Sequence, residues 1–288
     1  MIEFLLVLGV IWIVAAIIQD FKQREVANWL NFSLIIFALA FRAFYSVFFN
    51  NYMVFIFGLV GLLITFILAN LFYYSRLFAG GDAKLFIALG AIIPFEDSFY
   101  ENNLIFLVFL ISFLLGGVLY SLIYSLILTY NNKEKFNKSF KEIFNKKLTN
   151  LYFIFAFSLA FVIFSLISKD FIYLIIPAFF IIIFLLYVYT KSVEQSCMLI
   201  YVKAINLRPG DWLEKEIKIK NRTIMPNWEG LSEEEIKFIK ENYRKKVLIK
   251  QGIPFTPAFL IAFLVIILIK YFFNGDFKLF NLFEILWL

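Results

Sequence analysis

The 288-residue sequence contains no histidine and one cysteine, Cys197, and only 17% of its residues are charged. These absences exclude histidine-based catalytic triads, zinc sites made of cysteine and histidine, and any disulfide within the chain. Carboxylates, lysines and hydroxyls are left as candidates for chemistry. Hydrophobic residues make up 62% of the chain and the mean hydropathy is +0.86, whereas about half of a soluble domain is apolar. The composition predicts a membrane protein.

Eight apolar segments are candidates for membrane spans. Because a helix rises about 1.5 Å per residue and the hydrocarbon core is about 30 Å thick, a span needs about 17 to 25 apolar residues. Seven segments reach that length, and an eighth is shorter and is closed by Pro94, Glu96 and Asp97. The segments are residues 2–18, 29–49, 53–73, 83–95, 104–129, 151–168, 171–189 and 253–273. They predict an all-α polytopic membrane protein with about eight transmembrane helices.

Lysine and arginine are distributed unevenly between the loops. Of the 27 basic residues, 23 lie in alternate loops, beginning with the loop after the first span. Because cytoplasmic loops carry the excess of lysine and arginine, this pattern predicts a multi-pass protein of the cell membrane with both termini outside. The orientation accounts for the net charge of +6, so no nucleic-acid partner is needed to explain it.

A long polar segment, residues 191–251, precedes the last span. Turn residues from Arg208 to Asp211 and alternation from Glu216 to Lys220 predict short strands. Ser232, three residues before Glu235, predicts a capped helix from Glu233 to about Lys246. We therefore expect a small cytoplasmic α+β domain at 191–251. The other predicted divisions are a transmembrane core at 1–130, an amphipathic cytoplasmic segment with two further transmembrane helices at 131–190, and the last transmembrane helix and tail at 252–288.

Two aspartates are the candidates for chemistry. An Asp at the centre of a span costs about 3 kcal/mol, and ionisable residues that persist at the membrane tend to be functional. Asp20 closes the first span and Asp82 opens the short one, both at predicted cytoplasmic ends. Gly80 and Gly81 permit close backbone approach or positive φ before Asp82, and the helix start favours a carboxylate there. By spacing alone, a helix cap or a charge at the end of a span is the simpler explanation of either aspartate.

The sequence around the aspartates resembles a known family. Residues 20–28 read Asp-x-Lys-x-Arg-x-Val-x-Asn, and residues 80–84 read Gly-Gly-Asp-x-Lys. Together with Gly-Ile-Pro-Phe-x-Pro at 252–257, these strings resemble the type IV prepilin peptidases, specifically the archaeal preflagellin and prepilin peptidases of the Gly-x-Gly-Asp class of membrane aspartic proteases. Ala79 replaces the first glycine of that motif, and Ala27 stands where proline often precedes the asparagine. Neither departure removes a reacting group.

The resemblance implies an activity and its residues. Asp20 and Asp82 correspond to the catalytic aspartates, which act on a water molecule without cofactor or metal. Residues that bind substrate or shape the site are Gly80, Gly81, Lys84 and Asn28, although Lys84 and Asn28 also fit a boundary lysine and a helix cap. The implied partners are the lipid bilayer and pilin-like or archaellin precursors, whose short basic leader is cleaved at the cytoplasmic membrane face.

Other functions remain open on the residues alone. An ion- or proton-coupled transporter uses membrane aspartates, but it predicts charges near mid-membrane in repeated halves, and the sequence contains neither. A signal-peptide-peptidase-like intramembrane protease also uses Gly-x-Gly-Asp. That class has Tyr-Asp and Pro-Ala-Leu strings, where this chain has Gln19-Asp20 and Pro257-Ala258-Phe259. A catalytically inactive scaffold is the remaining alternative.

Overall fold

The computed structural model describes residues 2–94, 98–220 and 222–272. The chain forms two compact units, which are described separately: Met1–Leu122 with Ile253–Leu288, and Ile123–Gly252. The outer end of the predicted short span, with Glu96 and Asp97, and the predicted tail after Phe272 lie outside the described residues. The four-part division into residues 1–130, 131–190, 191–251 and 252–288 remains a prediction.

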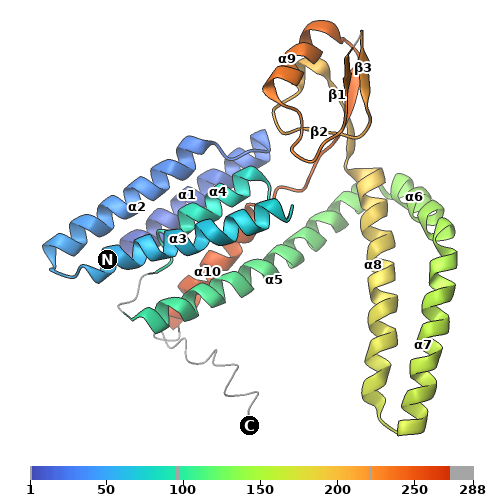
Figure 1. The fold of residues 1–288 in the computed structure, drawn as a ribbon, viewed down its shortest axis with the longest axis horizontal. Coiled ribbons are helices and arrows are strands. Elements are labelled where there is room, and N and C mark those ends of the chain that lie inside the picture. Colours follow the sequence, from blue (N-terminus) through green and yellow to red (C-terminus); the bar gives the residue numbers. More distant parts are fainter. Residues whose placement is uncertain (1, 95–97, 221, 273–288) are drawn as a thin grey trace. The chain divides into compact units, whose positions relative to one another are not determined.

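The first unit is a helical bundle that surrounds a short central helix (Figure 1). Its helices are α1 (Ile2–Gln23), α2 (Asn28–Phe48), α3 (Met53–Tyr74), α4 (Gly80–Gly90), the first part of α5 (Phe99–Asn131) and α10 (Pro257–Phe272). Helix α4 packs against α2 and α3. The ring of Phe86 on α4 lies 6.1 Å from that of Phe109 on α5 and 6.3 Å from that of Phe259 on α10. Helix α4 is therefore buried by neighbours on several sides, as expected for a helix that is apolar around its circumference.

Small residues on α3 allow α4 to approach closely. Four of the five buried positions on α3 are small residues: Gly58, Gly61, Thr65 and Ala69. A Cβ at Gly61 would collide with the carbonyl oxygen of Gly90, and a Cβ at Gly90 would collide with the hydroxyl of Thr65. Because lipid supplies no hydrophobic drive for helix association, such close packing is a main source of bundle stability.

Arg42 of α2 holds the carboxyl-terminal end of α4. Its side chain is fully buried, and its Nε donates to the carbonyl of Ala91 at 2.7 Å. The guanidinium also donates to the carbonyls of Val54 at 2.8 Å, Ile92 at 3.0 Å and Pro94. A cation at the negative end of a helix is favourable, and carbonyls without partners in the bilayer are costly. Arg42 therefore stabilises an early end of α4.

The structure contains helices suited to crossing a membrane. Within the described residues, six are long and apolar enough: those in α1, α2, α3, α5, α7 (Leu148–Ser168) and the segment Phe171–Cys197. The eleven-residue α4 does not reach this length, and the apolar stretch Pro257–Tyr271 of α10 is also shorter. The mostly helical architecture is confirmed, whereas the count of eight spans is not confirmed.

The second unit contains a long helical hairpin. The end of α5 leads into α6 (Lys133–Lys146), α7, the short η1 (Phe171–Leu174) and α8 (Ile175–Cys197). The apolar side of α6, with Ile143 and neighbouring aromatic residues, packs against Phe184 and Val188 of α8. Its lysines lie mainly on the exposed side. The structure thus contains an amphipathic helix in the predicted segment.

A small strand-containing region follows α8. It consists of β1 (Leu199–Lys203), η2 (Ala204–Asn206), β2 (Trp212–Leu213), β3 (Ile217–Ile219), β4 (Arg222–Ile224), α9 (Glu233–Asn242) and β5 (Lys246–Lys250). One antiparallel sheet has the order β1-β5-β2, with Tyr201 opposite Leu248 and Leu213 opposite Ile249. Strands β3 and β4 form a separate antiparallel pair. The predicted mixture of strands and helix before the last helix is confirmed.

The predicted helix in this region is correct at its start and too long at its end. Ser232 and Glu235 form the complete capping box. The helix ends at Asn242, because Tyr243 takes an extended conformation, and β5 begins at Lys246. Val247 and Ile249 alternate into the core. That two-residue period is typical of a strand, and the end predicted near Lys246 was wrong.

Candidate active site

Asp20 lies near the end of α1 in a buried polar contact with the start of α10. The residue is 7% exposed. Its Oδ2 accepts a hydrogen bond of 2.9 Å from the Thr256 hydroxyl and a longer one of 3.4 Å from the Thr256 N–H. Thr256 is fully buried and immediately precedes the first residue of α10. The fold thus joins two polar residues that lie far apart in the sequence.

Asp82 lies in the first turn of α4 and is partly buried. The backbone of Ala79, the residue before the helix, lies near its carboxyl. A carboxylate three residues after the residue that precedes a helix suits the helix start, so Asp82 also fits a structural role there. The charge of Asp20 acts on the Asp82 carboxyl. The structure therefore brings the two predicted aspartates, from different helices, within electrostatic reach of one another.

The glycines before Asp82 differ in their surroundings. A Cβ at Gly81 would lie 3.2 Å from the backbone nitrogen of Val26, so this glycine permits α4 to begin against the α1–α2 loop. A Cβ at Gly80 would meet only a ring atom of Tyr73, at 3.9 Å. Neither glycine is among the described residues with positive φ. The glycine at position 81 is explained by the close approach of the Val26 backbone, and not by a left-handed turn.

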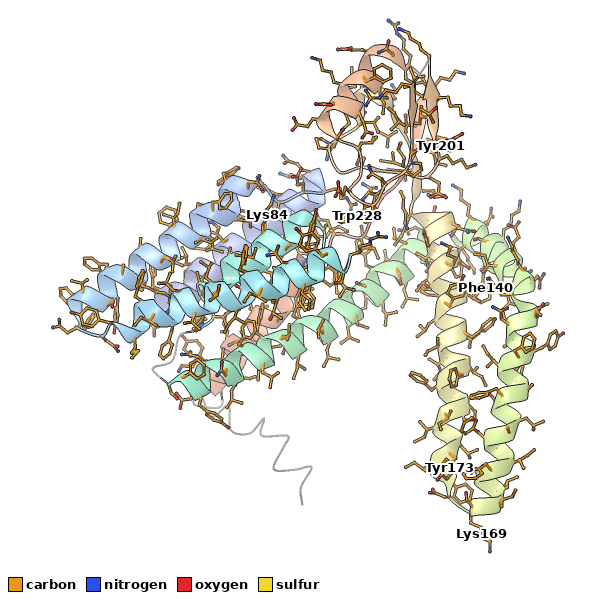
Figure 2. The ribbon with its side chains drawn as sticks, viewed as in Figure 1. Lys84, Phe140, Lys169, Tyr173, Tyr201 and Trp228 are labelled. Carbon is orange, nitrogen blue, oxygen red and sulfur yellow. The ribbon has the colours of Figure 1, made fainter. Side chains whose placement is uncertain are left out.

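Lys84 and Asn28 form a contact with each other. The Lys84 ammonium donates a 2.6 Å hydrogen bond to the side-chain oxygen of Asn28, the first residue of α2. Figure 2 labels Lys84 at the end of the first unit where α4 begins. Helix positions two residues apart do not face each other, so Lys84 and Asp82 take different directions. The contact ties the starts of α2 and α4 together.

Three polar residues of this region were not predicted from the sequence. Thr256 binds Asp20, and Gln19 accepts a 3.0 Å hydrogen bond from the N–H of Ala27 in the loop after α1. Asn31, one turn beyond Asn28, is 2% exposed, and its amide has no hydrogen-bond partner among the described residues. Thr256 occupies the variable position of the Pro-Phe-x-Pro string, so no motif identified it. No motif assigned a contact to Gln19 or to Asn31.

The arrangement is suited to acid–base chemistry with two carboxylates. Two carboxylates that lie close together can divide the roles of acid and base between them. One member then accepts a proton while the other donates one. Within the described residues, no group of three or more histidine, cysteine, aspartate or glutamate side chains is placed to hold a metal ion.

Comparisons with known proteins agree with the resemblance seen in the sequence. Residues 7–121 match the model of the type IV leader peptidase family. Preflagellin peptidases are similar to this chain: that of Methanococcus maripaludis is 32% identical over 103 residues, and that of Methanocaldococcus jannaschii is 33% identical over 88 residues. That of Methanococcus voltae is 30% identical over 87 residues. No solved structure matches.

The matched segments are partial on both sides. They cover 35%, 31% and 30% of this chain in the order given, and 44%, 37% and 37% of the relatives. The chain thus spans less than half the length of the curated relatives it matches. Both aspartates lie within the family match, whereas Thr256 lies outside it. The resemblance to the type IV leader peptidases is therefore confirmed for residues 7–121, the segment that carries Asp20 and Asp82.

Proposed function

We propose that the protein is a membrane-embedded aspartic endopeptidase that removes the short basic leader from pilin-like or archaellin precursors at the cytoplasmic membrane face. The observation that carries this proposal is the electrostatic interaction between Asp20 and Asp82, which come from separate helices of the first unit. The family match over both residues supports the same reaction.

The proposed mechanism uses the two carboxylates and one water. The ionised aspartate takes a proton from the water as its oxygen attacks the scissile carbonyl carbon. The protonated aspartate polarises the carbonyl oxygen, and proton return to the leaving amine accompanies cleavage of the C–N bond. Both carboxylates end in their starting protonation states. This chemistry uses none of the residue types that are missing from the sequence.

The proposed substrate fits the proposed position of the site. A precursor with a basic leader before a hydrophobic helix places the helix in the bilayer and the leader in the cytoplasm. Its scissile bond then lies at the inner interface, where the predicted topology puts Asp20 and Asp82. The relatives are named preflagellin peptidases, which favours archaellin precursors within this class.

The test is cleavage of precursor archaellins and pilins by the purified full chain in lipid. Asp20→Asn and Asp82→Asn should each reduce leader removal to background, because each removes a proton donor or acceptor while keeping the side-chain shape. Asp170→Asn is a matched control, since Asp170 caps η1 in the second unit and asparagine also caps helices. This variant should cleave as the wild type does.

Two outcomes would contradict the proposal. Full cleavage by either Asp20→Asn or Asp82→Asn would exclude a reaction that needs both carboxylates. Ion flux through the protein in proteoliposomes, with no cleavage of any precursor, would favour the transporter alternative instead.

A further inference from the structure

The hydroxyl of Thr256 is directed to Asp20 and not to its own helix. A residue before a helix usually accepts hydrogen bonds from the first N–H groups. Here, Pro257 has no N–H, Ala258 donates to the carbonyl of Phe255 at 3.0 Å, and Phe259 donates to the carbonyl of Thr256 at 3.1 Å. The first N–H groups of α10 therefore bond to backbone carbonyls. The Thr256 hydroxyl is left for the 2.9 Å bond to Asp20.

This contact favours the charged form of Asp20. A hydroxyl can donate or accept, but a backbone N–H can only donate. The Thr256 N–H reaches the same Oδ2 at 3.4 Å, which identifies that oxygen as an acceptor. The positive end of the α10 dipole opposes the negative end of the α1 dipole, where Asp20 itself lies. The two hydrogen bonds from Thr256 therefore remain as the contacts that stabilise the negative charge of Asp20.

Asp82 has no comparable hydroxyl contact among the described residues. The start of α4 favours a charge at its position, but burial and the negative charge of Asp20 both disfavour its charged form. When two nearby carboxylates share one proton, the proton resides on the member whose charged form is less stabilised. The contacts of the two residues therefore favour an ionised Asp20 and a protonated Asp82.

We propose that Thr256 is a positioning residue that orients Asp20 and keeps it ionised, so that Asp20 is the base and Asp82 the acid of the pair. This inference rests on the proposed peptidase function. In the hydration step, the water oxygen bonds to the carbonyl carbon, a water proton passes to Asp20, and the Asp82 proton passes to the carbonyl oxygen. In the cleavage step, the C–N bond breaks, Asp20 gives its proton to the amine, and Asp82 recovers a proton from the diol.

The experiment compares Thr256→Val with Thr256→Ser in the full chain. Valine keeps the shape and removes the donor, so kcat should fall about ten- to hundredfold, the range for a hydrogen bond to a charged group, with KM changed little. The acid limb of the pH–rate profile should move to higher pH, because the ionised form is less stable without the donor. Serine keeps the hydroxyl and should restore both the rate and the profile.

Thr65→Val is the matched control. Thr65 is also fully buried in the first unit, and its hydroxyl bonds to the carbonyls of Gly61 and Leu62 on its own helix and of Ile87 on α4, but to no carboxylate. Loss of this hydroxyl should leave the pH profile unmoved. Thermal unfolding of each variant establishes that the compared proteins are folded. If Thr256→Val has the kcat and the pH–rate profile of the wild type, the inference about Thr256 is overturned. The proposed peptidase function would be unaffected by that result.

An infrared measurement tests the inference without substrate. The carboxylate band that Asp20→Asn removes is followed during a pH titration of the full chain in lipid. We expect this band to persist to lower pH in the wild type and in Thr256→Ser than in Thr256→Val. Identical titrations would overturn the role of Thr256. If the wild type cleaves no precursor, the proposed function fails, and this titration still decides whether Thr256 stabilises the charge of Asp20.

Discussion

At the scale of single residues, Arg42 has an important structural role in the first unit. It is a fully buried cation whose partners are the carbonyl oxygens of Val54, Ala91, Ile92 and Pro94. Five donors in a fixed plane suit several carbonyls at once, which a lysine ammonium does less well. Its role as the cap of α4 depends on contacts between separate helices, which no local sequence pattern encodes.

We predict that Arg42→Met destabilises the bundle by about 3 kcal/mol or more, because it leaves buried carbonyls without donors. Arg42→Lys should lie between this variant and the wild type, since one ammonium satisfies fewer of the carbonyls. The measurement is thermal or denaturant unfolding of the purified full chain in detergent. Equal stability of Arg42→Met and the wild type would show that α4 ends without this cap.

Asn31 presents the opposite case, a buried polar side chain whose amide has no partner within the described residues. Such a group costs about 1 to 3 kcal/mol in protein mutational data. Asn31→Leu, which keeps the branching, should therefore raise the unfolding midpoint. A fall in stability would instead indicate that the amide is satisfied in the folded protein. Cleavage assays on the same variant would show whether the activity requires the Asn31 amide despite its cost in stability.

The residue scale also shows how far the sequence predicts the site. Asp20 and Asp82 were identified from strings that surround them, and the structure brings them within electrostatic reach. Thr256 was not identified, because its contact with Asp20 spans 236 positions. A threonine hydroxyl is also compatible with almost any environment. The roles of Asp20, Asp82, Lys84 and Asn28 in catalysis or binding remain predictions.

At the scale of elements, α4 determines where Asp82 lies. Its start is fixed by the close approach of Gly81 to Val26, and its end is held by Arg42. The sequence predicted a short apolar segment here from the spacing of charges. The early end at Gly90 could not be predicted, because it requires the Arg42 side chain from another helix. Similarly, the helix predicted to reach about Lys246 ends at Asn242, and β5, which pairs with β1 and β2, begins at Lys246.

We predict that Gly81→Ala lowers kcat about tenfold or more, because the added Cβ would lie 3.2 Å from the Val26 backbone and displace the start of α4. A displacement of about 1 Å in a catalytic group can reduce the rate by as much as a hundredfold. Gly80→Ala is the comparison, since its Cβ would have room and its effect should be much smaller. The assay is precursor cleavage at saturating substrate, with unfolding midpoints measured in parallel. Equal effects of the two substitutions would contradict this account.

At the scale of the whole molecule, the proposed reaction requires a particular membrane topology. The loops after α1 and between α3 and α4 must lie on the same side, because they adjoin Asp20 and Asp82. The charge distribution predicts that this side is the cytoplasm, with the α2–α3 and α7–α8 turns outside. The single cysteine makes the test direct, because a Cys197→Ser protein contains no other thiol.

We predict that a membrane-impermeant maleimide labels Asn50→Cys and Lys169→Cys in intact cells, each in the Cys197→Ser background. Lys22→Cys and Ser75→Cys should react only after the membrane is permeabilised, and all four positions are exposed in the structure. Each variant must still cleave precursor, so that its topology is that of the active protein. Labelling of the Lys22 and Ser75 positions from opposite sides would exclude the two-aspartate mechanism. Labelling of both from outside would leave the chemistry possible but reverse the face from which a precursor must present its leader.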